Sequence, residues 1–161
     1  MPQQPESQAA EPFEEPPREE IPGISRSHVA YMETTDAEEA WCIAGMHHVV
    51  LHTIGRKSGN EHKVALPYWV DGDGNRVVVA SFSGAPDHPS WYLNLSDRDA
   101  NPEVKIRVQQ GEFWADAQVL DGGDYAETWA GLTVDRPWYD DYQSRTDRQI
   151  PLVRLIELRP A

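Results

Sequence analysis

The stretch His48-Val-Val-Leu-His-Thr-Ile-Gly-Arg-Lys-Ser-Gly59 holds the pattern from which the fold is predicted: an apolar, β-branched run that ends in a short basic turn. A second apolar run, 63–70, begins shortly after the turn. Runs of this composition bounded by glycine are typical of β-strands. Because the whole chain carries a net charge of -13, a cationic loop at a strand end indicates a binding site for an anion.

Further runs of the same kind extend the pattern into a sheet. The expected strands are 48–54, 63–70, 76–81, 104–108, 113–119 and 150–158. Asp71-Gly-Asp-Gly74 and Gln110-Gly111 provide turns for two hairpins, which indicates an antiparallel sheet. Pro67 lacks the N–H that an inner strand needs, so its strand is expected at an edge or a bulge.

Short helices are expected around this sheet. Two are predicted within 25–44, the first with Ser27 as a possible N-cap, and another covers 89–95. Asp124 is predicted to cap a helix whose apolar face repeats at helical spacing, and a further helical turn begins at Pro137. Strands, then a helical insertion, then a returning strand predict an α+β fold around a small antiparallel barrel or strongly curled sheet.

Composition defines the expected domain and its surroundings. Residues 1–24 are rich in Pro and Glu and are predicted to form a disordered acidic tail, and 25–161 a single domain. The acidic charge argues against binding nucleic acid or anionic lipid. The absence of a long apolar run and of signal-peptide features predicts a cytoplasmic protein without stable membrane insertion. Cys42, the only cysteine, excludes an internal disulfide and a cysteine-based zinc site.

Familiar site motifs do not match. On one strand His48 and His52 would lie roughly 13 Å apart, too far to share a metal ion, so no metal site is predicted. The basic turn has a Lys-Ser pair but lacks the spacing of a phosphate-binding P-loop, and Gly72-Asp-Gly74 lacks the third glycine of a dinucleotide fingerprint. No nucleophile elbow is found.

Four segments remain that could converge on one ligand. The basic segment 55–63 offers two charges, a hydroxyl and turn amides, and the small residues of 80–85 allow close approach to a planar ligand. Trp91 lies with Asn94 on one helix, and Tyr139 shares a helix face with Tyr142. Each segment alone is more often structural, as a solvated turn or a core aromatic, but their joint occurrence favours a site.

These motifs, in this order, resemble the deazaflavin-dependent nitroreductase family, whose members use coenzyme F-420. The resemblance rests on Gly55-Arg-Lys-Ser-Gly59, Val79-Ala-Ser81 with Gly84-Ala-Pro86, His88-Pro-x-Trp-Tyr-x-Asn-Leu95, Ala100-Asn-Pro-x-Val104, Asp141-Tyr-Gln143 and Thr146-Asp-Arg-x-Ile-Pro151. It implies an antiparallel split β-barrel of the flavin-binding type with short flanking helices, in agreement with the strand pattern.

The resemblance also implies roles for individual residues. The anionic tail of coenzyme F-420 would be held by Arg56, Lys57 and Ser58, with His62 and Lys63 close by. The ring pocket would be formed by Val64, Ala65, Tyr68, Ala80, Ser81, Phe82, Ser90, Trp91, Asn94 and Tyr139. Tyr139, then Ser81 and Tyr142, would polarise the acceptor carbonyl or protonate the product.

The implied activity is hydride transfer from the reduced deazaflavin to a small electron-poor acceptor: a quinone, an enone or a nitroaromatic compound. Two alternatives remain open: an oxidoreductase that uses flavin mononucleotide on the same fold, and a non-catalytic protein that only binds coenzyme F-420. The fold often pairs into homodimers. The sequence departs from the family pattern at His62, Ala65, Phe82 and Arg136.

Overall fold

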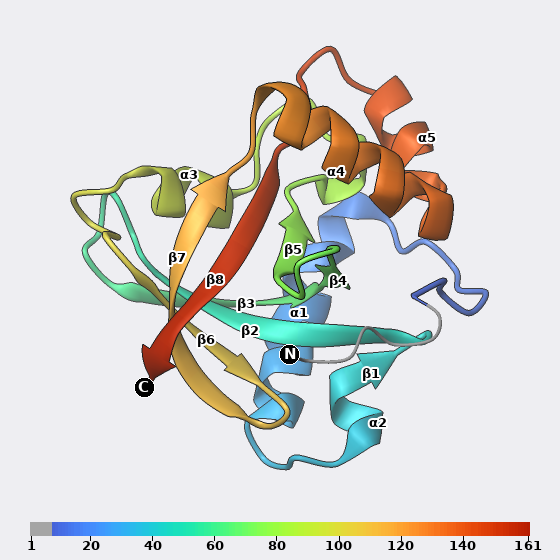
Figure 1. Ribbon diagram of the computed structural model, residues 1–161. Helices are drawn as coiled ribbons and strands as arrows, with labels where there is room; N and C mark the ends of the chain where they lie inside the picture. Colours follow the sequence, from blue (N-terminus) through green and yellow to red (C-terminus); the bar gives the residue numbers. More distant parts are fainter. Residues whose placement is uncertain (1–7) are drawn as a thin grey trace.

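The computed structural model describes residues 8–161, and its centre is a curled antiparallel sheet (Figure 1). Among these residues the sheet has eight strands in the order β1-β2-β6-β7-β8-β5-β4, with β3 paired to β2. The strands are β1 Cys42–Ile43, β2 Met46–Ile54, β3 Glu61–Pro67, β4 Trp69–Val70, β5 Arg76–Val79, β6 Val104–Val108, β7 Gly111–Val119 and β8 Leu152–Pro160. The antiparallel curled sheet predicted from the sequence is confirmed.

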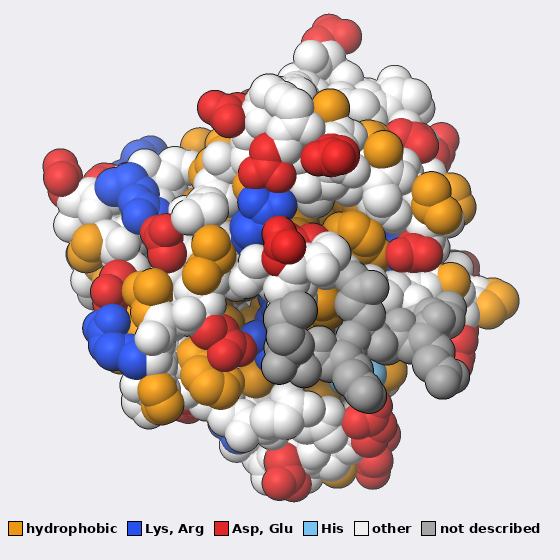
Figure 2. Space-filling view, viewed as in Figure 1, with side chains coloured by type: hydrophobic (Ala, Val, Ile, Leu, Met, Phe, Trp, Pro, Cys, Tyr) orange, Lys and Arg blue, Asp and Glu red, His pale blue; other side chains and the backbone are white. Residues whose placement is uncertain are grey.

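Short helices surround the sheet without forming a separate layer. They are η1 Arg18–Glu20, α1 Ile21–Met32, α2 Glu38–Trp41, η2 Phe82–Gly84, α3 Ser90–Ser96, α4 Gly122–Asp135 and α5 Trp138–Ser144. Figure 1 shows α4 and α5 together at one end of the sheet and α2 at the other, while α1 packs against β3. Figure 2 shows acidic side chains in many scattered groups on this face and basic side chains in fewer groups.

The sheet is buried on both faces at β5, because neighbouring side chains enter different cores. Val78 belongs to a cluster inside the curled sheet, together with Ile106 and Val153. Val77 and Val79 point to the opposite face and pack under α4 and α5. Successive strand residues alternate between faces, so this short strand joins the barrel interior to the helical end of the molecule.

Most strand signals in the sequence were placed correctly, but two helix starts were not. Helix α1 begins at Ile21, with Glu20 at its N-cap position, so the prediction that Ser27 caps the first helix is wrong: Ser27 lies inside it. Strand β3 ends at Pro67 and pairs only with β2, as expected of an edge strand. Helix α4, however, begins at Gly122, with Asp121 at its N-cap position. The prediction that Asp124 caps this helix is wrong, because its carboxylate instead binds the guanidinium of Arg154 at 2.8 Å.

Residues 1–24 were predicted to form a disordered acidic tail, and the structure differs from this prediction in the part that it describes. Residues 1–7 lie outside the described part of the chain, but 8–24 hold a defined path and end in the first turn of α1. Gln8 forms two hydrogen bonds with the backbone of Val70, at 2.6 and 2.8 Å. Composition measures how much apolar surface a segment can bury, and it does not register polar attachments of this kind.

Candidate functional site

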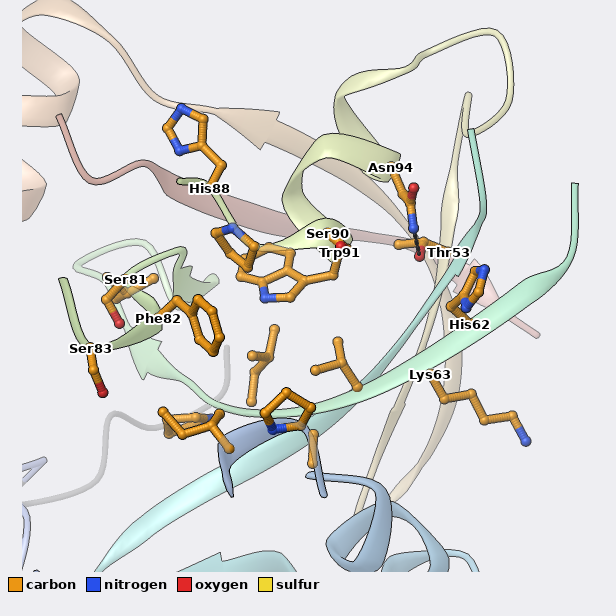
Figure 3. Close-up of a pocket in the computed structure, with 18 of the residues that line it drawn as sticks. Thr53, His62, Lys63, Ser81, Phe82, Ser83, His88, Ser90, Trp91 and Asn94 are labelled. Atoms are coloured by element: carbon orange, nitrogen blue, oxygen red, sulfur yellow. Dashed lines mark hydrogen bonds between the residues drawn. The ribbon is translucent and has the colours of Figure 1, made fainter. Parts of the chain in front are cut away.

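A cavity of about 930 Å³ lies between β2, β3, α3, α5 and the segment that precedes α1. Figure 3 shows Ser81, Phe82 and Ser83 at one end of it, and Asn94 and His62 at the other. Trp91 lies between the two ends, and apolar side chains of β3 and α1 complete the walls. The cavity is large enough for a cofactor-sized ligand.

The basic loop 55–59 is a tight turn at the end of β2. The Gly55 amide donates to the carbonyl of Asn60 at 2.8 Å, and the Gly59 amide donates back to the carbonyl of Gly55 at 2.9 Å. A Cβ on Gly55 would stand 2.5 Å from the Ser58 hydroxyl oxygen and 2.8 Å from the His62 ring. A side chain at position 55 would therefore displace the Ser58 hydroxyl and the His62 ring from the positions they take beside the loop.

Asn94 of α3 holds the arginine of this loop. Its side-chain carbonyl oxygen Oδ1 accepts from the Arg56 guanidinium at 2.8 Å and from the Arg56 backbone amide at 3.2 Å. Its Nδ2 donates to the Thr53 hydroxyl at 3.4 Å (Figure 3). Asn94 is 4% exposed, so the guanidinium is fixed from a buried position before any ligand arrives.

A second buried asparagine supports the first. Asn101 exchanges hydrogen bonds with the backbone of Ile54 at 2.7 and 2.9 Å, and it donates to the backbone carbonyl of Asn94 at 2.8 Å. It thereby ties the end of β2 to α3. Sequence reasoning quoted this residue only as part of a motif and gave it no role, because its partners are distant in sequence.

The strand end after β5 forms the opposite wall. Phe82 and Ser83 have positive φ angles of 43° and 53°, which are uncommon for residues other than glycine. Arg148 stabilises this turn from behind by donating to the carbonyls of Ala80 and Ser81 at 3.0 and 2.8 Å. The turn directs the Phe82 ring into the cavity (Figure 3).

Two tyrosines of α5 face the cavity beside this turn. Tyr139 is 4% exposed and Tyr142 is 8% exposed, and their rings meet edge to face at 5.9 Å. Burial raises the pKa of Tyr142 to about 12. Burial also raises the pKa of Tyr139, against the opposing effect of the positive charge on Arg136. Both phenols therefore stay protonated at neutral pH and can donate a hydrogen bond.

His48 also lines the cavity, whereas the sequence predicted only that it is not a metal ligand and gave it no place in the site. Burial and the nearby His28 ring lower the pKa of His48 to about 3, and its Nδ1 hydrogen-bonds the carbonyl of Met46 at 2.9 Å. The imidazole is therefore neutral at physiological pH. A neutral donor of this kind adds no charge to the apolar part of the cavity.

Lys63 contributes less to the cavity than expected. Figure 3 shows its side chain extending away from the other labelled residues. Its Nζ forms an ion pair with Glu33 of α1 at 2.8 Å, and this partner raises the pKa of Lys63. His62 lies beside the basic loop, 3.3 Å from the Ser58 hydroxyl. Arg56 and Lys57 are thus the cations that the loop itself presents.

Most of the predicted site residues surround this one cavity. Those that line it are Arg56, Lys57, Ser58, His62, Lys63, Val64, Ala65, Ser81, Phe82, Ser90, Trp91, Asn94, Tyr139 and Tyr142. Ala80 does not line it, because its side chain is fully buried in the barrel core. Tyr68 also lies elsewhere, beneath the guanidinium of Arg76 at 5.2 Å. Sequence reasoning missed the N-terminal lining residues Phe13, Pro16, Ile21 and Pro22, and also Trp138.

One cluster outside the cavity has side chains of the kind that bind metals. Donor atoms of Glu38, Cys42 and His47 lie within 4.8 Å of one another. His47 already hydrogen-bonds Glu38 at 2.9 Å, and the Cys42 thiol has a pKa raised by burial. Because metals bind the thiolate, this environment does not favour coordination by Cys42.

Comparisons with known proteins point to one family. A family model described as F420H(2)-dependent quinone reductase matches residues 24–157. A Mycobacterium tuberculosis protein described as an F420H(2)-dependent quinone reductase is 39% identical over 110 residues, which are 66% of this chain and 71% of that protein.

Two solved structures share the fold. One is described as an F420-H2 dependent reductase (FDR-A), with a TM-score of 0.56 and 35% identity over 67% of this chain and 92% of that chain. The other, described as a domain-swapped dimer, has a TM-score of 0.60 and 31% identity over 81% of this chain and 92% of that chain. Within residues 8–161 of the present chain, no helix combines the length and apolar character needed to cross a membrane.

Proposed function

The chain belongs to the F420H(2)-dependent quinone reductase family, and we propose that it transfers a hydride from reduced coenzyme F420 to a quinone or a similar electron-poor acceptor. The family resemblance recognised from the ordered motifs is confirmed by the match over residues 24–157. An enone or a nitroaromatic compound has the same electron-poor character and is included in the proposed acceptor class.

The observation that carries this proposal is the fixed guanidinium of Arg56 at one end of a long, largely apolar cavity. Coenzyme F420 has a planar deazaflavin ring at one end and a phosphodiester with an oligoglutamate tail at the other. Arg56 and Lys57 provide positive charge for the anionic part, and the Ser58 hydroxyl provides a further donor. The apolar walls formed by Val64 and Trp91 suit the planar ring.

The chain must also position the acceptor and supply a proton. When bound, the reduced deazaflavin supplies the hydride, and the protein supplies orientation and hydrogen bonds. We assign the proton-donating role to the Tyr139 hydroxyl, which lines the cavity and stays protonated at neutral pH. Tyr142 and Ser81 lie in the same wall and support the acceptor through their hydroxyl groups.

Arg136 acts on this donor from behind. Arg136 is 2% exposed, and its Nε donates to the backbone carbonyl of Gln8 at 3.1 Å. Its positive charge opposes the rise in the pKa of Tyr139 that burial causes. A negative charge that develops on the phenol oxygen during proton transfer is therefore stabilised by this guanidinium.

A homodimer is a further part of the proposal. It is supported by the structural relative that is described as a domain-swapped dimer and is 31% identical to this chain. The mass of the purified protein in solution, measured by light scattering, tests it. Twice the mass of the chain is expected, and the mass of a single chain would exclude a stable dimer.

The cofactor is tested by titrating the purified protein with coenzyme F420 and, separately, with flavin mononucleotide. Tight binding of F420 alone is expected, whereas preference for flavin mononucleotide would support the other cofactor. Oxidation of reduced F420 is then followed with menadione as the acceptor. Binding of F420 without turnover of any quinone, enone or nitroaromatic compound would support a carrier protein instead of an enzyme.

A further inference from the structure

The segment 8–20, which we call the N-terminal strap, crosses the cavity end that is remote from the basic loop. Its first residue is fixed to the edge strand β4 through the paired hydrogen bonds of Gln8 with Val70. The Glu11 amide then donates to the carbonyl of Ala44 at 2.7 Å. From there the strap runs to η1 and α1, whose residue Ile21 lines the cavity.

Two charged side chains hold the strap against the far wall. Glu15 forms a bidentate ion pair with the Arg145 guanidinium, with N–O distances of 2.7 and 3.2 Å. The hydrogen bond from Arg145 lowers the pKa of the Glu15 carboxyl group. Arg18 donates to the carbonyl of Ser83 at 3.2 Å. In Figure 3 Ser83 lies at the end opposite His62, so the strap is tied to the end away from the proposed anion site.

Phe13 is the aromatic residue that the strap adds to this end. Its ring meets the Trp138 ring edge to face at 5.2 Å, and both residues line the cavity. Phe13 is still 42% exposed, and its partner Trp138 in turn contacts the ring of the proposed proton donor Tyr139, with the ring centroids 5.4 Å apart. An apolar surface left open in a cavity wall is one that an apolar ligand can cover.

The strap lies outside the part of the chain that the family model matches, since that match begins at residue 24. The basic loop and Tyr139, in contrast, fall within the matched span. The strap therefore provides a wall of the cavity that is separate from the matched residues around the proposed anion site.

We propose that Phe13, backed by Trp138 and held by the Glu15–Arg145 ion pair, forms an apolar subsite that selects acceptors with a fused or alkyl-substituted ring. This inference rests on the proposed function. It assigns Phe13 a contact with the ring system of the acceptor beyond the carbonyl that Tyr139 would polarise. A compact acceptor reaches Tyr139 without touching Phe13, so it gains nothing from the subsite.

The test compares two quinones of different size in the full-length protein. With Phe13→Ala, we expect kcat/KM for menadione to fall about tenfold and kcat/KM for 1,4-benzoquinone to change less than about twofold. Phe13→Leu should restore most of the menadione activity, because it restores apolar contact. Glu15→Gln should produce a weaker form of the same selectivity change, whereas Glu14→Gln, an exposed neighbour in the strap, should have no effect.

The binding constant for coenzyme F420 is measured for every variant and should stay within about twofold of that of the unmodified protein. An equal loss for both quinones, or no change for either, would overturn the subsite while leaving the proposed reductase activity intact. Failure of the unmodified protein to bind F420, or to reduce either quinone, would instead contradict the proposed function on which the subsite depends.

Discussion

The hydrogen bond between Asn94 and Arg56 makes a specific prediction about affinity for coenzyme F420. Arg56→Ala removes a half-buried guanidinium that is held at 2.8 Å by Asn94 and points to the cavity. A hydrogen bond to a charged group contributes about 1.5–3 kcal/mol. At 1.4 kcal/mol per factor of ten, the dissociation constant should rise roughly 10- to 150-fold.

Asn94→Ala should act on the same interaction in a weaker form. The guanidinium remains, but it must then be ordered on binding, which costs about 0.5–1.5 kcal/mol for a long side chain. Affinity should therefore fall about 2- to 12-fold. Once Arg56 is replaced by alanine, there is no guanidinium for Asn94 to hold in place. The double variant should therefore lose the same affinity as Arg56→Ala alone.

The assay is a fluorescence titration with oxidised coenzyme F420 at low and at high salt, because added salt screens the contribution of an exposed charge. Arg159→Ala is the matched control, since it also removes one positive charge but lies in a surface ion pair with Glu103 outside the cavity. Urea unfolding checks that each variant is folded. Unchanged affinity for Arg56→Ala, or additive losses in the double variant, would refute the reasoning.

Three further predictions concern the rest of the site. Tyr139→Phe should lower kcat with menadione about 100-fold while the F420 dissociation constant changes less than about twofold, and equal effects on both would remove its assigned role as proton donor. In the folded protein the pKa of His48 is about 3, whereas in the unfolded chain it has its ordinary value of about 6.5. Between these two pH values only the unfolded chain is protonated at this residue, so the free energy of unfolding should fall by about 1.4 kcal/mol for each pH unit as the pH decreases. Urea unfolding of His48→Gln should show a shallower loss over this range, and an unchanged slope would contradict the assignment. Gly84→Ala should cost about 1–3 kcal/mol of unfolding free energy, because φ is +73° and the new Cβ would lie 2.4 Å from the Tyr142 carbonyl, whereas Gly72→Ala meets nothing within 4 Å and should be close to neutral.

Much of the sheet followed from the sequence because its signals are local. The alternation of apolar residues and the two hairpin turns identified the strands and their antiparallel arrangement. The start of α4 was misplaced by a few residues because Asp124 resembles a cap, while its carboxylate is used by Arg154 of β8. That partner is 30 residues away and leaves no local signal.

The basic loop 55–59 could be located from the sequence, but the residues that fix it could not. Gly55-Arg-Lys-Ser-Gly59 can be recognised because it carries two positive charges in a chain whose net charge is -13. The role of Asn101 depends on contacts with Ile54, 47 residues earlier. The strap was missed for a related reason: Phe13 stands alone among prolines and glutamates, and its partner Trp138 lies at the other end of the chain.

The central claim is that the cavity holds reduced coenzyme F420 and passes its hydride to a quinone. Its most direct test mixes the purified protein with reduced F420 and menadione under anaerobic conditions and follows the absorbance of oxidised F420. We expect rapid, catalytic oxidation of F420 that depends on the enzyme and is strongly reduced by Tyr139→Phe. No oxidation above the rate without protein, at an F420 concentration that saturates the cavity, would contradict the account.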